Sequence, residues 1–136
     1  MILVDTSVIV DSFKGADNEK VELFRQILKR GMPFGISAYT FQEVLQGARD
    51  EREYVRLKDY LSNQKIYCIR EEIDIYEKAA RLFFDLRRKG ITIRSSIDIL
   101  ISLTAIENDL YLLCNDGDFH KIKTVQADLK ILERLM

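Results

Sequence analysis

The first candidate for chemistry is a carboxylate near the start of the chain. Asp5 ends the apolar run Met1–Val4 and is followed by two hydroxyl residues, Thr6 and Ser7. A short apolar run of this kind is typical of a strand that is buried on both faces of a parallel sheet. Ligands bind at the carboxyl ends of such strands. We therefore predict that Asp5 faces a crevice at that edge of the sheet.

Four further carboxylates are expected at the same edge. Asp116 and Asp118 follow the apolar segment Tyr111–Cys114, which has the features of another buried strand. Glu43 lies shortly after a second short apolar segment, and Asp98 lies in the first turn of a predicted helix. The carboxyl ends of parallel strands share one edge of a sheet, so these side chains are predicted to converge on Asp5.

Each of these carboxylates also has a structural interpretation. Asp5 is a suitable helix cap, and both Thr40-x-x-Glu43 and Ser95-x-x-Asp98 resemble capping boxes. Asp116 and Asp118 flank Gly117, as turn residues often do. As a group, however, bare carboxylates in one crevice repel each other and acquire raised pKa values. A hard divalent cation resolves this conflict, and oxygen ligands without Cys or His favour Mg²⁺ or Mn²⁺ over Zn²⁺.

The remaining composition excludes several other chemistries. The single histidine, His120, lies in a charged segment and has no partner arrangement typical of a Ser-His-Asp or Cys-His site. No GxxxxGK[ST] or GxGxxG loop is present. Metal-assisted hydrolysis of a phosphodiester remains, because it needs no side-chain general base. Arg94 is the basic residue best placed by position to contact a phosphate.

Alternating strands and helices surround these residues. Apolar runs predict strands at Met1–Val4, Phe34–Ile36, Ile66–Ile69 and Tyr111–Cys114, while 3.6-residue periodicity predicts helices at Asp17–Arg30, from Thr40, at Glu51–Leu61, at Glu72–Lys89 and from Ser95 or Ser96. The segment Leu129–Met136 fits either an edge strand or a short helix. Such alternation predicts a parallel sheet between helices, as one α/β domain spanning residues 1–136.

Bulk properties narrow the class of protein. The chain has 136 residues, an apolar fraction of 47%, one proline and a net charge of −1. These values favour one globular domain without a general basic coat for nucleic acid. No segment approaches the length of a membrane helix, so we expect a soluble, cytoplasmic protein. Cys68 and Cys114 both lie in apolar runs and are expected to be buried, reduced thiols.

Four stretches of the chain resemble the motifs of one known family. They are Leu3–Ile9, Ser37–Gly47, Ser96–Ile101 and Leu113–Phe119. In order and spacing they resemble the PIN-domain ribonucleases, and specifically the VapC-type toxins of prokaryotic toxin–antitoxin modules. The resemblance covers essentially the whole chain. One departure is Cys114, where many members of the family carry Thr, and it blurs which of the two nearby aspartates takes the fourth acidic role.

The resemblance implies a fold, an activity and partners. The fold would be a three-layer α/β/α arrangement with a central parallel sheet of four to five strands. The activity would be RNA cleavage dependent on Mg²⁺ or Mn²⁺, by a homodimer that a cognate VapB-type antitoxin inhibits. Family metal ligands correspond to Asp5, Glu43 and Asp98. The fourth acidic position corresponds to Asp116, expected nearer the metal, with Asp118 close by.

The resemblance also implies that the hydroxyl of Thr6 or Ser7 would lie near the metal or its water.

Two other functions compete with a nuclease. Phosphoryl transfer to Asp5 is disfavoured, because Asp5-Thr6-Ser7 lacks the second Asp that haloacid-type phosphatases carry two residues later. A catalytically silent RNA- or protein-binding module on the same fold is the remaining alternative. The presence of every expected acidic residue favours a working enzyme.

Overall fold

The computed structural model describes residues 1–135, and five parallel strands form its sheet. The last residue, Met136, belongs to the predicted terminal segment and lies outside the described residues. The strands are β1 (Ile2–Val4), β2 (Phe34–Ser37), β3 (Lys65–Tyr67), β4 (Tyr111–Leu113) and β5 (Lys130–Ile131). Their order in the sheet is β3-β2-β1-β4-β5, so the first strand lies at the centre.

Helices connect these strands within residues 1–135. They are α1 (Thr6–Phe13), α2 (Glu19–Lys29), α3 (Ala38–Gln46), α4 (Glu51–Ser62), α5 (Ile73–Arg88), α6 (Ser96–Glu107) and α7 (Asp118–Val125). None of them has both the length and the apolar composition needed to cross a membrane.

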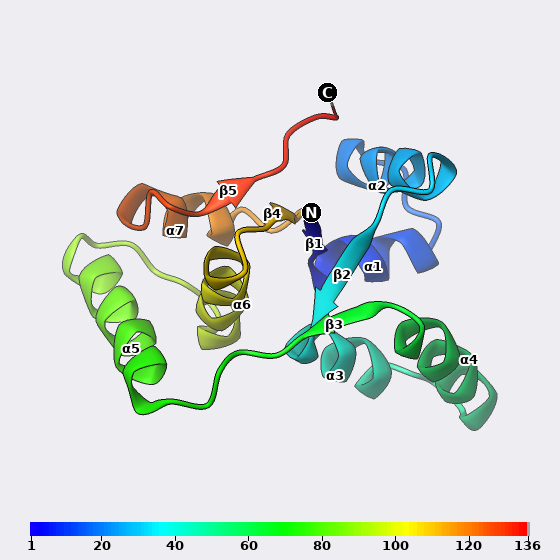
Figure 1. Cartoon of the computed structure of the whole chain (residues 1–136), viewed down its shortest axis with the longest axis horizontal. Coiled ribbons are helices and arrows are strands. Elements are labelled where there is room, and N and C mark those ends of the chain that lie inside the picture. The colour runs from blue at the N-terminus through cyan, green and yellow to red at the C-terminus, as the bar shows by residue number, and fades with distance from the viewer. Residues whose placement is uncertain (136) are drawn as a thin grey trace.

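Side-chain alternation along the strands creates the two cores of a three-layer structure. In β1, Leu3 packs with α5, α6 and α7, whereas Ile2 and Val4 pack with α1, α2, α3 and α4. The neighbouring strand β4 alternates in the same way, with Leu112 in the first core and Leu113 in the second. Figure 1 shows these two groups of helices on opposite sides of the strands. The predicted α/β/α fold with a parallel sheet is therefore confirmed.

Local features of the structure differ from the sequence-based predictions at α3, Cys68 and α7. Helix α3 begins at Ala38 rather than near Thr40, because Ser37 caps it and accepts a hydrogen bond from the Thr40 N–H at 3.0 Å. The strand β3 ends at Tyr67, which leaves Cys68 exposed instead of buried. Helix α7 was not predicted, since the polar cluster at its start has the composition of a turn.

Gly35 allows the close approach of β2 and β3. A Cβ atom here would lie 2.5 Å from Tyr67 Cε2 and 2.8 Å from the main-chain oxygen of Lys65. We therefore expect Gly35→Ala to lower the free energy of unfolding by roughly 1–3 kcal/mol, as overpacking usually does. Denaturant titration measures this loss. Gly47→Ala is the matched control, because its Cβ would meet nothing closer than 3.5 Å; equal stability of the two variants would contradict the steric explanation.

Candidate active site

The carboxylates gather where the strand order reverses. The chain runs outward from β1 through β2 to β3, and then returns to the other side of β1 for β4 and β5. Asp5 directly follows β1 and its main-chain N–H donates to the Leu113 carbonyl of β4 at 2.9 Å. The crevice at such a reversal is the usual ligand site of open parallel sheets. The predicted position of Asp5 at a strand end is therefore confirmed.

Asp5 is both a helix cap and a member of this site. The residue is only 3% exposed, and its Oδ2 accepts from the Ser7 N–H at 3.1 Å and the Ser7 hydroxyl at 2.7 Å. The Ser7 oxygen in turn accepts from the Asn115 N–H at 3.1 Å. Burial raises the pKa of Asp5 to about 6, although the hydrogen bonds from Ser7 act in the opposite direction. The structural and the chemical interpretations of Asp5 are thus compatible.

Asn115 was not singled out from the sequence. Besides its backbone contact with Ser7, its side-chain amide donates to Asp11 Oδ2 and Asn18 Oδ1, both at 3.0 Å. These bonds join the loop after β4 to the end of α1 and the start of α2. Only its place directly before Asp116 could have drawn attention to it.

The carboxylate of Glu43 accepts a hydrogen bond from a hydroxyl at the start of α1, the helix that follows β1. The Thr6 hydroxyl donates to Glu43 Oε1 at 2.7 Å and lies 3.1 Å from the Thr40 hydroxyl oxygen. Because α3 begins at Ala38, Glu43 lies in its second turn, and the predicted capping box with Thr40 does not form. Thr6 and Ser7, one of which is predicted to supply a hydroxyl near a metal or its water, each donate a hydrogen bond to a carboxylate of this group.

Asp98 is the carboxylate with the least support from its surroundings. It lies half-buried in the first turn of α6, which Ser95 caps as predicted through its side chain. Within residues 1–135, no donor makes a hydrogen bond to its carboxylate, unlike those of Asp5 and Glu43. Desolvation, followed by the negative charges of Asp5 and other acidic neighbours, raises the pKa of Asp98 to about 7.

Asp116 and Asp118 share a basic partner. Arg94 Nη2 lies 2.9 Å from Asp116 Oδ1, and Arg94 Nε lies 3.4 Å from Asp118 Oδ2. The Arg94 main-chain N–H also donates to Asp118 Oδ2 at 3.1 Å, while Lys121 Nζ lies 3.3 Å from the other oxygen. Burial by itself would raise the pKa of Asp118, but the Arg94 N–H and Lys121 hold it below its ordinary value.

Three of these carboxylates form a group with the dimensions of a cation site. Asp98, Asp116 and Asp118 each offer an oxygen, and the three oxygens lie within 4.8 Å of one another. Asp5 and Glu43 are close enough for their charges to raise the pKa of Asp98. The donors are all oxygens and their negative charge is incompletely balanced, which fits Mg²⁺ or Mn²⁺.

Neither sulfur nor imidazole competes for this role. Cys114 is buried, and desolvation together with the charge of Asp5 raises its thiol pKa to about 12. A thiol with that pKa remains protonated at neutral pH and is a poor metal ligand. His120 is half-exposed, and its Nε2 lies 3.6 Å from Glu133 rather than near the carboxylates.

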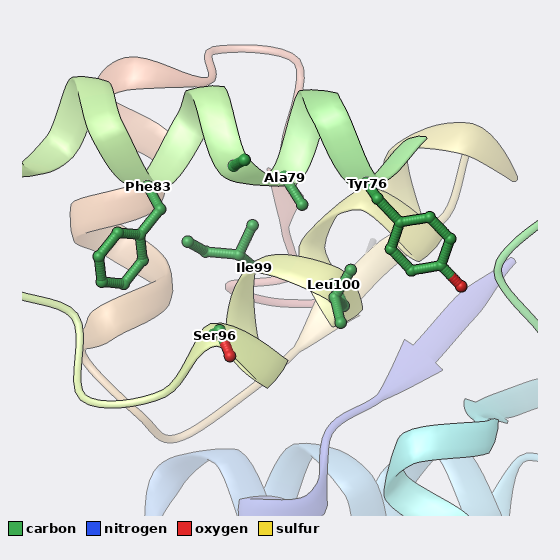
Figure 2. Close-up of a pocket in the computed structure, with 7 residues that line it drawn as sticks. Tyr76, Ala79, Phe83, Ser96, Ile99 and Leu100 are labelled. Atoms are coloured by element: carbon green, nitrogen blue, oxygen red, sulfur yellow. The ribbon is translucent and has the colours of Figure 1, made fainter. Parts of the chain in front are cut away.

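A separate apolar cavity lies between α5 and α6. It has a volume of about 350 Å³ and includes Tyr76, Phe83, Ser96 and Leu100 in its lining. Figure 2 shows the aromatic rings of Tyr76 and Phe83 at opposite ends of this cavity. No acidic residue lines it, so it is distinct from the carboxylate site.

Fold and site define an α/β/α protein with a carboxylate site at the reversal point of a parallel sheet. One known family fits this description, because the family model of the PIN domain matches residues 2–125 of the chain. The chain belongs to the PIN domain family, and the resemblance in its motifs is confirmed.

The chain is also similar to proteins that are named as ribonucleases. The chain is 29% identical over 126 residues to the VapC ribonuclease Mb1587 of Mycobacterium bovis and to ribonuclease VapC11 of Mycobacterium tuberculosis. Each match covers 92% of this chain and 93% of the relative.

Solved structures of similar fold include a toxin–antitoxin complex from Klebsiella pneumoniae, with a TM-score of 0.68 and 23% identity over 99% of this chain and 100% of that one. VapBC2 from Rickettsia felis, bound to a promoter DNA fragment, matches with a TM-score of 0.69 and 22% identity and covers 100% of both chains. FitAcB from Neisseria gonorrhoeae matches with a TM-score of 0.70 and 21% identity over 98% of this chain and 97% of that one. At these identities, the matches establish a shared fold.

Proposed function

We propose that this protein is a metal-dependent endoribonuclease that hydrolyses RNA phosphodiester bonds, as the toxin of a type II toxin–antitoxin pair. The observation that carries the proposal is the group formed by Asp98, Asp116 and Asp118, whose oxygens lie within 4.8 Å of one another. The relatives named as ribonucleases and the structural neighbour solved as a toxin–antitoxin complex support the same function. Asp5, Glu43, Asp98 and Asp116 are the proposed catalytic residues.

The acidic residues of the site would bind a divalent cation, and a basic residue would bind the RNA. A divalent cation, Mg²⁺ or Mn²⁺, supplies Lewis-acid activation of water for phosphodiester hydrolysis when bound. Asp5, Glu43, Asp98, Asp116 and Asp118 would hold it.

Hydrogen bonds fix the direction of two of these ligands. Ser7 orients the carboxylate of Asp5, and Thr6 orients that of Glu43. Ordered ligands lower the entropic cost of forming a site. Arg94, whose side chain is 76% exposed beside the carboxylates, is the proposed contact to an RNA phosphate.

Asp116 is the better candidate for the fourth metal ligand. Asp118 has both oxygens engaged, one by the Arg94 N–H and the other by Lys121, and it is 3% exposed. Among residues 1–135, Asp116 accepts hydrogen bonds only at Oδ1, from Arg94 and from the Asp118 N–H at 3.0 Å. We therefore assign direct coordination first to Asp116, with Asp118 as the closest additional ligand.

The partners and organisation follow from the same proposal. We propose a single PIN-like domain over residues 1–136, located in the cytoplasm, that forms a homodimer and binds a VapB-type antitoxin. Exposed apolar side chains on α5 support a protein-binding surface: Ile73 is 84% and Tyr76 is 44% exposed.

The test is RNA cleavage by the purified, antitoxin-free protein in Mg²⁺ or Mn²⁺. We expect cleavage that EDTA abolishes and that excess Mg²⁺ restores, because the proposed reaction depends on the bound cation. Gel analysis of a labelled total RNA pool detects cleavage of whichever RNA is the target. A folded protein that binds RNA but leaves it intact under all these conditions would contradict the nuclease and favour the silent binding module.

A further inference from the structure

Arg94 connects the loop before α6 to two carboxylates of the site. Its guanidinium contacts Asp116 Oδ1 at 2.9 Å through Nη2 and Asp118 Oδ2 at 3.4 Å through Nε. These two residues, with Asp98, are the three that offer oxygens within 4.8 Å of one another. One guanidinium therefore binds two of the three carboxylates that are spaced to hold a cation.

A guanidinium and a divalent cation compete for such oxygens. Each needs the same negative charge, and two positive groups a few ångströms apart repel each other. We propose that Arg94 is an intramolecular counter-ion, which a divalent cation must displace from Asp116 and Asp118 to occupy the site. This inference rests on the proposed function, because it takes these carboxylates as the metal ligands.

The surroundings of Arg94 make displacement possible without disturbing the fold. Its side chain is 76% exposed, so the guanidinium can move into solvent. Its main-chain N–H separately donates to Asp118 Oδ2 at 3.1 Å and still anchors the loop after the side chain has moved. Lys121 Nζ contacts Asp118 Oδ1 and, in the part of the chain that the structure describes, bridges no pair of carboxylates.

Competition of this kind sets the apparent affinity for the cation. If only the form with Arg94 released accepts the ion, the apparent affinity equals the intrinsic affinity multiplied by the fraction of molecules in that form. Release also leaves a free guanidinium beside the site, where it is available for an RNA phosphate. Arg94 would thus change partner when the cation binds.

The test is calorimetric titration of the whole protein with Mn²⁺. We expect Arg94→Ala to bind Mn²⁺ about fivefold more tightly than the parent chain, since the two ion pairs of this exposed guanidinium no longer compete with the cation. Arg94→Lys keeps the charge without the planar fork and should fall between the two. Arg88→Ala is the matched control: it removes the same charge from the end of α5, where Arg88 lies over the Phe84 ring. Its affinity should change by less than about twofold.

The opposite result would mean that Arg94 orients the ligands. Unchanged or weaker Mn²⁺ binding by Arg94→Ala would overturn the inference, even if the parent chain cleaves RNA, and would leave the proposed function intact. If no variant binds Mn²⁺, the inference and the proposed metal dependence both fail. Thermal unfolding in EDTA verifies that each variant is folded, and Arg94→Gln replaces Arg94→Ala if that variant does not fold.

Discussion

Asp98→Asn is expected to lose RNA cleavage by roughly 100-fold or more, because several kcal/mol of cation-dependent catalysis depend on its charge. The same variant should unfold at a higher temperature than the parent chain in EDTA at pH 8. The two effects have one cause. Burial and acidic neighbours destabilise the Asp98 carboxylate, raising its pKa to about 7, and a neutral amide of the same size removes this repulsion.

The substitution should leave the local structure intact. Within residues 1–135, the Asp98 carboxylate has no hydrogen-bond donor to lose, and the α6 cap is formed by Ser95. Asn keeps the shape of the side chain. A loss of activity in Asp98→Asn can therefore be assigned to the charge rather than to unfolding.

Cleavage rates in Mn²⁺ and melting temperatures in EDTA measure the two effects. Asp85→Asn is the matched control, because Asp85 lies on α5 and pairs with Arg81, away from the site. It should cleave RNA at the parent rate. If Asp98→Asn cleaves RNA as fast as the parent chain, Asp98 is not a catalytic residue. If this variant melts at a lower temperature than the parent chain, the proposed repulsion between Asp98 and its acidic neighbours is contradicted.

The sequence predicts the features that depend on local patterns. The apolar run before Asp5 identifies a buried strand, because this pattern spans only a few neighbouring residues. Ser95 is recognised as a cap for the same reason. The edge at which the carboxylates meet follows from the general geometry of parallel sheets.

Contacts between distant segments could not be predicted in this way. The bond from Thr6 to Glu43 joins residues 37 positions apart, and it depends on how α1 and α3 pack after their strands have paired. Sequence position alone predicts that Arg94 contacts a phosphate, and it does not reveal that the side chain pairs with Asp116 and Asp118. Helix α7 is stabilised by burial of Phe119 and Ile122, which local propensity does not reveal.

Stability in EDTA is expected to fall as the pH rises from 5 to 8. The carboxyl groups of Asp5 and Asp98 have folded-state pKa values of about 6 and about 7, above the ordinary value of 3.8. Between pH 4 and 7 the folded chain therefore holds protons that the unfolded chain has released, so raising the pH favours unfolding. For the buried Asp5, the penalty above pH 6 is on the order of 3 kcal/mol.

A bound cation should reverse this dependence. A divalent ion favours the ionised carboxylates, so the stabilisation by Mg²⁺ should increase over the same pH range. Carboxylates with lowered pKa values, such as Asp74 and Asp118, gain their stabilising effect at lower pH and do not mask the trend. Melting temperatures at pH 5 and pH 8, with EDTA or excess Mg²⁺, measure both slopes, and Asp98→Asn should flatten them. A parent chain equally stable at both pH values in EDTA would show that the carboxylates lack the repulsion that the proposed cation relieves.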